Sequence, residues 1–339
     1  MLQPGKERLR ELISAYSSLT RFISYISLSM LWDSRRQQLN LQPGASFAPL
    51  PFSLIPEEAE YQSTDYIFRA KAYQERLGQL KKAVVDPIGL IPKINDFLNK
   101  VEQEEELGQG YLVMEGWKQS MAAGEKQLEE LMKSRAKGNA DGLKQLVLEA
   151  EAIYTRFLKA ALFLTEYKLH TVRSIVVDKL RSLDDSRPYS HYTISLHAAF
   201  SELQTMLTER ETATDSYCLL LTHRAQEGDV LAEAINLSPL YIDQTSYINN
   251  NTRDYPAVFT LDYRKGQDME AEYCFHYIDT DVNHQYTFAN DHQLAINWLG
   301  APYLEHIELE PEDEELFKRI HEQLMHLEQD IPHQNPDAQ

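Results

Sequence analysis

The sequence predicts an α+β protein in which helices predominate. It indicates an N-terminal multi-helix bundle with a long central helix, followed by a smaller C-terminal α+β domain with an antiparallel hairpin or three-stranded sheet. Apolar residues recur at helical spacing through much of residues 1–215. Further along, two consecutive segments alternate apolar and polar residues, as half-buried strands do. A chain of 339 residues with 43% hydrophobic content can bury a core without disulfides.

The predicted domain organisation follows from where the residue pattern changes from helical spacing to strand alternation. We expect a helical domain over residues 1–215, an acidic α+β domain over 216–331 and a frayed tail over 332–339. A proline-rich extended connector, 40–63, lies within the first domain. Its prolines lack an amide donor and bias the preceding residues away from helix: Pro43, Pro49, Pro51 and Pro56.

The first helix is predicted by apolar residues spaced three and four apart, which share one helical face: Leu12, Tyr16, Leu19, Ile23, Ile26 and Met30. Serines fill much of the remaining surface and predict a polar face. The apolar stripe must pack against its own domain, a partner helix or a membrane surface. A serine-rich rather than lysine-rich polar face disfavours the membrane.

Further helices are expected between glycine and proline breaks, at 64–85, after Pro92, from Trp117 to Gly138, at 141–183 and at 191–213. Gly108 and Gly110 are expected to mark a turn. The segment 157–169 is apolar on several faces, which is typical of a buried central helix. The sequence therefore predicts that the helix over 141–183 is the centre of the bundle.

The strand evidence is concentrated in the second domain. Residues 217–222 are a short apolar run, either strand or helix. The segments 255–263 and 269–278 alternate and predict a hairpin. A three-residue loop with Gly266 in the left-handed region would pair Phe259 with Tyr273.

Residues 286–289 are expected to add a third strand, and a helix is expected to begin near His292. A terminal helix over 311–330 is favoured by Pro311 and by the acidic residues of its first turn. Phe317 and Ile320 lie on its apolar face.

Histidines and carboxylates gather near the end of the chain, which raises the question of a metal site. The candidate ligands are His276, His284, His292, Asp279 and Asp281. They would meet only if the segment around 279–285 folds back between neighbouring strands. The alternative is that these side chains line the edge of a sheet.

Four better-defined chemical motifs are incomplete or absent in the sequence. The run from Asp279 has no glycine at the sixth position of an EF-hand loop and no glutamate at the twelfth. His321 and His326 are five residues apart, whereas the zinc-protease helix needs four. There is no complete phosphate-binding loop and no G-x-S-x-G elbow.

Charge and cysteine content limit the partners and the compartment. The net charge is −19, and residues 276–339 hold 14 acidic side chains against Lys318 and Arg319, so nucleic-acid binding there is disfavoured. Two cysteines are too few for a disulfide framework and favour a cytoplasmic location. No apolar run is long enough to predict a transmembrane segment.

These observations favour a non-enzymatic protein–protein interaction or assembly subunit of an intracellular complex, with no cofactor and with a protein partner or a second copy. The alternative is a metal-dependent hydrolase that uses the histidines and aspartates with a divalent transition metal. Aromatic side chains suit an interface, although most could equally be core. The interaction candidates are Tyr273, Phe275, Tyr277, Phe317 and Ile320.

Overall fold

A computed structural model covers the chain and divides it into two compact units. It describes residues 5–45, 47, 49–61, 65–136, 140–176, 189–196, 205–210, 219–224, 231, 233–243, 258–266, 272–277, 284–288, 294–298, 304–307 and 321–329. The helical unit comprises residues 1–31, 59–81 and 89–165, and the sheet unit comprises 32–58, 82–88 and 166–339. The predicted α+β class, with helices predominant, is confirmed.

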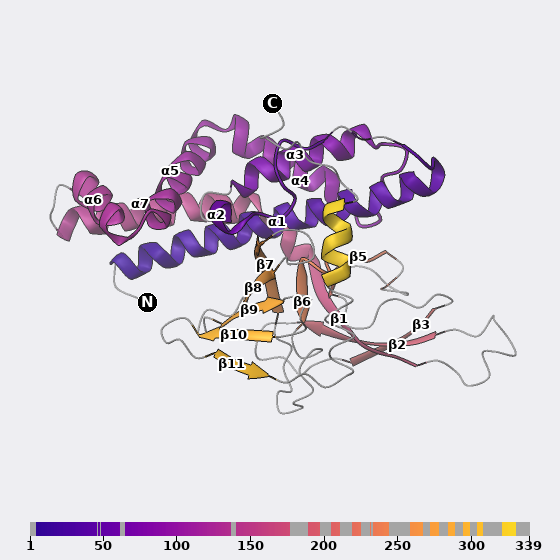
Figure 1. Cartoon of the computed structure of the whole chain (residues 1–339). Coiled ribbons are helices and arrows are strands. Elements are labelled where there is room, and N and C mark those ends of the chain that lie inside the picture. The colour runs from indigo at the N-terminus through magenta and orange to yellow at the C-terminus, as the bar shows by residue number, and fades with distance from the viewer. Residues whose placement is uncertain are drawn as a thin grey trace, which may run out of the picture. The chain divides into compact units, whose positions relative to one another are not determined.

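The helices appear in the order that Figure 1 labels. They are α1 (Lys6–Leu41), α2 (Glu58–Tyr61), α3 (Tyr66–Gln79), α4 (Leu90–Gln103), α5 (Glu105–Ala122), α6 (Glu125–Ala136) and α7 (Ala140–Ala160). A 3-10 turn, η1 (Leu162–Glu166), follows α7. The last change from the helical unit to the sheet unit lies between 165 and 166 rather than near residue 215. Residues 40–58 of the connector belong to the sheet unit, and 59–63 belong to the helical unit.

The predicted stripe of α1 is buried, but so are several of the serines expected on its polar face. Ser24, Ser27 and Ser29 are inaccessible or nearly so. The Ser27 hydroxyl donates to the Ile23 carbonyl at 2.9 Å and accepts from the Gln74 amide at 3.0 Å. A buried serine whose hydroxyl is bonded within its own helix is small enough to let another helix pack closely. Serine here is therefore a core residue.

Two glycines expected in a turn lie inside α5. A Cβ built on Gly110 would come within 3.0 Å of the Ile153 side chain on α7, and one on Gly108 would come equally close to the Val101 carbonyl. The glycines are needed because the backbone of α5 approaches its neighbours closely. The turn occurs later, at Gly124, which has φ +108° and separates α5 from α6.

The prediction of a long central helix over 141–183 is wrong. Helix α7 ends at Ala160, and the next element after η1 is the strand β1 (Tyr167–Val176). The helix predicted over 191–213 is also replaced by strands, β2 (Tyr189–Leu196) and β3 (Thr205–Arg210). Residues 171–176 contain four β-branched residues in six, which favour a strand once the helix has ended. The longest helix is α1.

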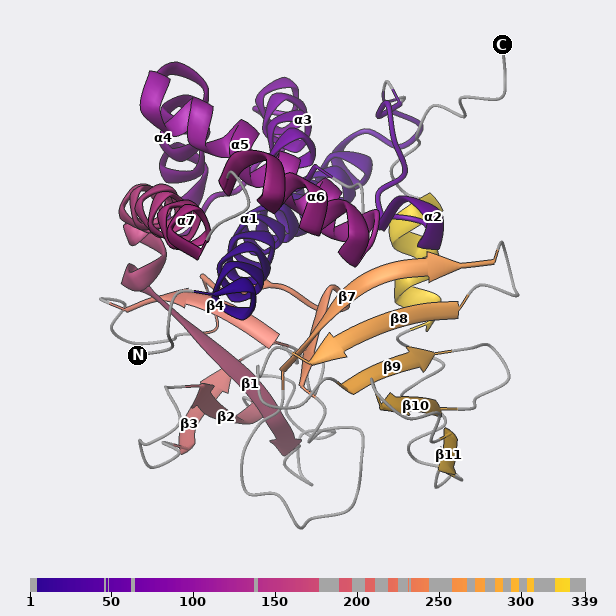
Figure 2. The same cartoon turned by 90° about the vertical axis from the view of Figure 1, so that its left-hand side faces the viewer.

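The sheet unit contains two antiparallel sheets among the described residues. The five-stranded sheet has the order β3-β2-β1-β4-β5, where β4 is Leu219–His223 and β5 is Ile235–Asn236. Residues 219–222 of the predicted apolar run are thus in a strand, and 217–218 lie outside the described residues. The six-stranded sheet has the order β11-β10-β9-β8-β7-β6, and Figure 2 shows β7 to β11 side by side.

The strands of the six-stranded sheet are β6 (Tyr241–Asp243), β7 (Val258–Lys265), β8 (Glu272–Tyr277), β9 (His284–Phe288), β10 (Leu294–Trp298) and β11 (Leu304–Ile307). The third strand predicted beside the hairpin is confirmed as β9. The helix expected from His292 is wrong, because β10 follows and pairs with both β9 and β11. The terminal helix is described over 321–329, with Leu324 and Leu327 buried.

The hairpin is confirmed, but its register is not the predicted one. Phe259 pairs with Tyr277 rather than with Tyr273, and Leu261 pairs with Phe275. The pairing shifts between Leu261 and Tyr263, where one strand carries an extra residue. Gly266 has the expected positive φ. Relative to the predicted pairing, the slip is four residues at Phe259 and Leu261 and five residues beyond the shift, so the predicted sharing of faces is kept only at Phe259 and Leu261.

In its described residues, the proline-rich connector forms turns and bends between the end of α1 and the short helix α2. Its apolar residues are covered: Leu50, Leu54 and Ile55 are buried. Within the described part of the chain, no helix combines the length and apolarity needed to cross a bilayer.

The close approach of α5 and α7 can be tested with two glycines on one helix. We expect Gly110→Val to lower the free energy of unfolding by about 1–3 kcal/mol, because its side chain would overlap Ile153. Gly116→Ala has open space at the same helix and should raise that free energy by up to about 1 kcal/mol. Urea unfolding followed by circular dichroism measures both. Equal effects at the two positions would contradict the packing described here.

Candidate functional site

The predicted metal ligands are only partly within the described residues. The backbone brings His276 and His284 to adjacent strands, β8 and β9, where Gln285 is the register partner of His276. His292, Asp279 and Asp281 lie outside the described residues. In the part of the chain that is described, no three His, Cys, Asp or Glu side chains are grouped to hold a metal ion. The metal-dependent hydrolase and its cofactor stay predictions.

The predicted interaction residues fall into two groups. Tyr273 and Phe275 have no exposed surface, so the structure places them in the interior of the sheet unit rather than on a docking surface. This placement corrects the expectation for these two residues, because an aromatic side chain that is fully buried in its own chain is a core residue. The backbone of Tyr277 ends β8. Phe317 and Ile320 lie outside the described residues.

A group of buried titratable side chains occurs instead in the helical unit. The Tyr16 hydroxyl of α1 donates to the Glu115 carboxylate of α5 at 2.9 Å. Lys118, one turn further along α5, lies 3.8 Å from the same carboxylate. Glu115 and Lys118 are each less than a tenth exposed, and Tyr16 is completely buried. A buried carboxylate therefore joins two helices through one hydroxyl and one ammonium group.

Asp65 forms the second part of this buried polar cluster. One of its carboxylate oxygens accepts from the Phe68 amide at 2.9 Å and caps the N-terminus of α3. The other oxygen accepts from the Tyr111 hydroxyl of α5. A side chain that caps one helix while it binds a second fixes where α3 begins relative to α5.

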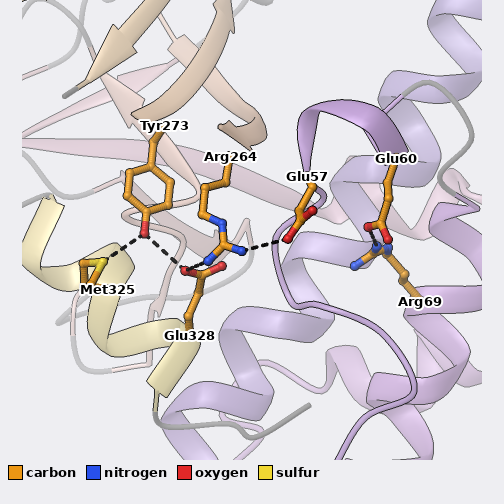
Figure 3. A network of polar contacts seen from close by, with 7 residues as sticks. All are labelled: Glu57, Glu60, Arg69, Arg264, Tyr273, Met325 and Glu328. Atoms are coloured by element: carbon orange, nitrogen blue, oxygen red, sulfur yellow. Dashed lines mark hydrogen bonds and ion pairs between the residues drawn. The ribbon is translucent and has the colours of Figure 1, made fainter. Parts of the chain in front are cut away.

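Cations complete the cluster around the ring of Tyr66. The Arg21 guanidinium lies 5.3 Å from the ring centroid, and the Lys118 ammonium lies 4.9 Å from it. Such contacts stabilise a cation that has lost water. Arg69, on the same helix as Tyr66, forms an ion pair with Glu60 at 3.7 Å (Figure 3).

Burial perturbs the acid–base behaviour of the cluster. Desolvation raises the pKa of Glu115, although Lys118 and the Tyr16 hydroxyl act in the opposite direction. Desolvation lowers the pKa of Lys118, although Glu115 opposes the change. Desolvation and the neighbouring Glu115 raise the pKa of Tyr16. Shifts of this kind mark functional sites in some proteins and structural ion-pair networks in others.

The contacts of this cluster favour the structural role. Its carboxylates, hydroxyls and cations are directed at one another from α1, α3 and α5 rather than at solvent. The burial of Glu115 and Lys118 is hard to predict from the sequence, because a Glu and a Lys three residues apart on a helix are usually a solvated surface pair. Their position beside Trp117, which is buried, was the available signal.

The sheet unit has its own ion-pair group, which is partly buried and centred on Arg264 near the end of β7 (Figure 3). The guanidinium contacts Glu328 of the terminal helix at 2.8 Å and Glu57 of the connector at 3.1 Å. The Arg264 amide also donates to the Pro56 carbonyl at 2.8 Å. Arg264 thus joins the connector and the terminal helix, which are distant in sequence, to strand β7.

We call Arg264, Glu57 and Glu328 the Arg264 clamp. Tyr273 of β8 also contacts it. Its hydroxyl lies 3.2 Å from Glu328 and 3.4 Å from the Met325 sulfur. Its ring packs edge-on against His321 at 5.5 Å between centroids. Desolvation, followed by the charge of Glu328, raises the pKa of Tyr273, so its hydroxyl stays protonated and can donate. This contact explains why Tyr273 is a core residue.

Comparison with protein-family models, with curated proteins and with solved structures finds no match to this chain in any of the three.

The ion pair of the helical cluster can be tested by removing one partner or both. We expect Lys118→Met to lower the free energy of unfolding by about 3–5 kcal/mol, because Glu115 then lies buried without its cation. Adding Glu115→Gln should recover most of this loss, since the amide still accepts from Tyr16. Urea unfolding measures both variants. Equal losses in the single and the double variant would contradict the pairing.

The same double variant should also change the pH dependence of stability. The raised pKa of Glu115 means that its deprotonation costs stability as the pH rises through that value. The lowered pKa of Lys118 means that its protonation costs stability as the pH falls through that value. Neither group remains in the double variant, so its stability should vary less with pH than that of the parent protein.

The Arg264 clamp offers a comparison of two carboxylates on one guanidinium. The Glu328 side chain is 12% exposed and that of Glu57 is 46% exposed. Glu328→Gln should therefore lower the free energy of unfolding by about 2–4 kcal/mol, whereas Glu57→Gln should cost less than about 1 kcal/mol. Added salt should weaken the contribution of Glu57 more than that of Glu328. Urea unfolding at low and high salt distinguishes the two.

Proposed function

We propose that this chain is a non-enzymatic protein–protein interaction or assembly subunit of an intracellular complex. Its finer attributes, a cytoplasmic location and a protein partner rather than nucleic acid, belong to the same proposal. The observation that carries it is a strip of exposed leucines on the helical unit, formed by α7 and the turn that follows it. We call this the leucine strip and define it as Leu148, Leu158 and Leu162.

The leucine strip lies on the side of α7 that faces away from its own core. The three side chains are between 43% and 57% exposed. At about 100° per residue, Leu148 and Leu158 are about 80° apart around the helix axis, and so they share one side. The opposite side is occupied by buried residues, including Ile153 and Phe157. Single exposed leucines are ordinary, but a set of them on one helix side is typical of a contact surface.

Side-chain contacts and close packing join α7, which carries Leu148 and Leu158, to its neighbouring helices. Arg8 of α1 contacts Glu151 of α7 at 3.0 Å, and Arg156 of α7 contacts Glu106 of α5 at 3.4 Å. Glycine allows α5 to pack directly on Ile153. Because α7 is held on both flanks, a partner would not have to order it, and the entropy cost of association is lower.

The surface charge of the second domain supports a protein partner over a nucleic acid. The terminal acidic excess repels phosphate backbones. Alternating charges on α7 itself, such as Glu149 and Lys159, form a polar border to the leucines. An apolar centre with a polar border is the usual composition of a protein interface.

The leucine strip can be tested in the full-length protein. We expect Leu148→Gln, Leu158→Gln and Leu162→Gln together to abolish stoichiometric co-purification of a partner from the native host, because glutamine removes apolar area but preserves helix propensity. The matched control is Phe68→Gln on α3, which removes a similarly exposed apolar side chain elsewhere. Unchanged circular dichroism confirms folding. Retention of the same partner by the triple variant, or its loss in the control, would overturn the proposal.

A further inference from the structure

Strand β3 is the edge of the five-stranded sheet among the described residues. It pairs with β2 along one side, from Thr205 opposite Ile194 to Arg210 opposite Tyr189. Its other side carries a row of backbone donors and acceptors that no described strand pairs. Such an edge is a template for another strand unless it is blocked.

An exposed apolar surface adjoins this edge. Leu207 of β3 is 56% exposed, and its register partner on β2, Tyr192, is also exposed. The next residue in that row is Ser174 of β1, and Val176, two residues further along β1, is exposed as well. Directly opposed residues share a face of the sheet, so Tyr192 and Leu207 form one apolar pair that reaches the edge.

The sequence of β3 lacks the features that usually protect an edge. It reads TMLTER, with no proline and no lysine, and its four leading residues are uncharged. Natural edge strands are blunted by proline, by bulges or by inward-pointing charges. Four uncharged leading residues that include β-branched threonines favour pairing instead.

We infer that β3 is the interface between two copies of this chain, which pair antiparallel through their β3 strands about a two-fold axis at Leu207. In this register Leu207 lies opposite Leu207 of the second copy, and the two five-stranded sheets become continuous. The apolar pair formed by Tyr192 and Leu207 then extends across the axis into its symmetry mate. The contact is isologous and closes at two copies, as most homo-oligomers do.

The charged residues of β3 favour antiparallel over parallel pairing of the two copies. In the antiparallel register centred on Leu207, Glu209 lies opposite Thr205 of the second copy, and no like charges oppose one another within the strand. A parallel pairing in register would stack Glu209 on Glu209 and Arg210 on Arg210, which destabilises a sheet. The reversed copy therefore avoids the like-charge contacts that the parallel copy would make.

This inference is independent of the proposed function in the residues that carry it. The leucine strip lies on α7, whereas the self-pairing edge lies on β3. The triple leucine variant should keep its self-association, and an edge variant should keep its partner. Failure of one proposal is therefore distinguishable from failure of the other.

The first experiment measures self-association of the full chain by sedimentation velocity over a wide range of concentrations. We expect a monomer–dimer equilibrium that Leu207→Lys weakens at least about tenfold, because it places two lysines opposite each other at the axis. The control is Leu112→Lys on α5, a leucine that is 68% exposed, and it should leave the equilibrium unchanged. A chain that stays monomeric throughout, or a dimer that Leu207→Lys leaves intact, would overturn the inference.

The second experiment tests the register. Residues opposed across antiparallel strands have Cα atoms about 4.5–5.5 Å apart, which is within the range that a disulfide can join. Leu207→Cys should therefore give a disulfide-linked dimer under mild oxidation, and Leu112→Cys should not exceed the background set by the native cysteines. A crosslinked yield for Leu207→Cys equal to that of Leu112→Cys would exclude the proposed axis.

Discussion

A buried charge needs an opposite charge or a hydrogen bond, and this requirement organises both compact units. In the helical unit, Glu115 is placed where Tyr16 and Lys118 can reach it, so α1 and α5 have one favourable relative position. In the sheet unit, Arg264 has the same role for the connector and the terminal helix. Apolar packing supplies most of the free energy in such folds. The polar pairs restrict which packing arrangement is adopted, because most alternatives would leave a charge unpaired in the interior.

The parts of the fold that the sequence predicted are those with a sustained period. The stripe of α1 and the alternation around Leu261 each specify a burial pattern that one element type satisfies. The strand β1 was not predicted because residues 157–169 are apolar on several faces, and such a run fits a buried helix as well as a buried strand. The choice between helix and strand depends on the pairing of β1 with both β2 and β4, which is a long-range property. The register of the hairpin failed for a local reason, since a bulge cannot be inferred from alternation alone.

The buried polar cluster was invisible in the sequence for a different reason. A glutamate, a lysine and an arginine on amphipathic helices are normally assigned to solvent, because burial is costly unless partners converge from other helices. Convergence depends on how α1, α3 and α5 pack, and spacing within one helix does not contain that information. Asp65 is the exception, since an aspartate just before an apolar helical segment is a recognisable cap. Its bond to Tyr111 is again a tertiary feature.

Net charge explains why association, where it occurs, should depend on small uncharged regions. Two copies of a chain with net charge −19 repel each other at long range, but this repulsion is screened beyond about 8 Å at physiological ionic strength. Only surfaces without local charge escape it at contact distance. The uncharged centre of β3 is one such surface. The leucine strip is an apolar surface with charged neighbours such as Glu149 and Lys159, and it is carried by the other unit. A strongly acidic surface interrupted at these places suppresses non-specific contacts everywhere else, so it favours a few defined partners over general adhesion.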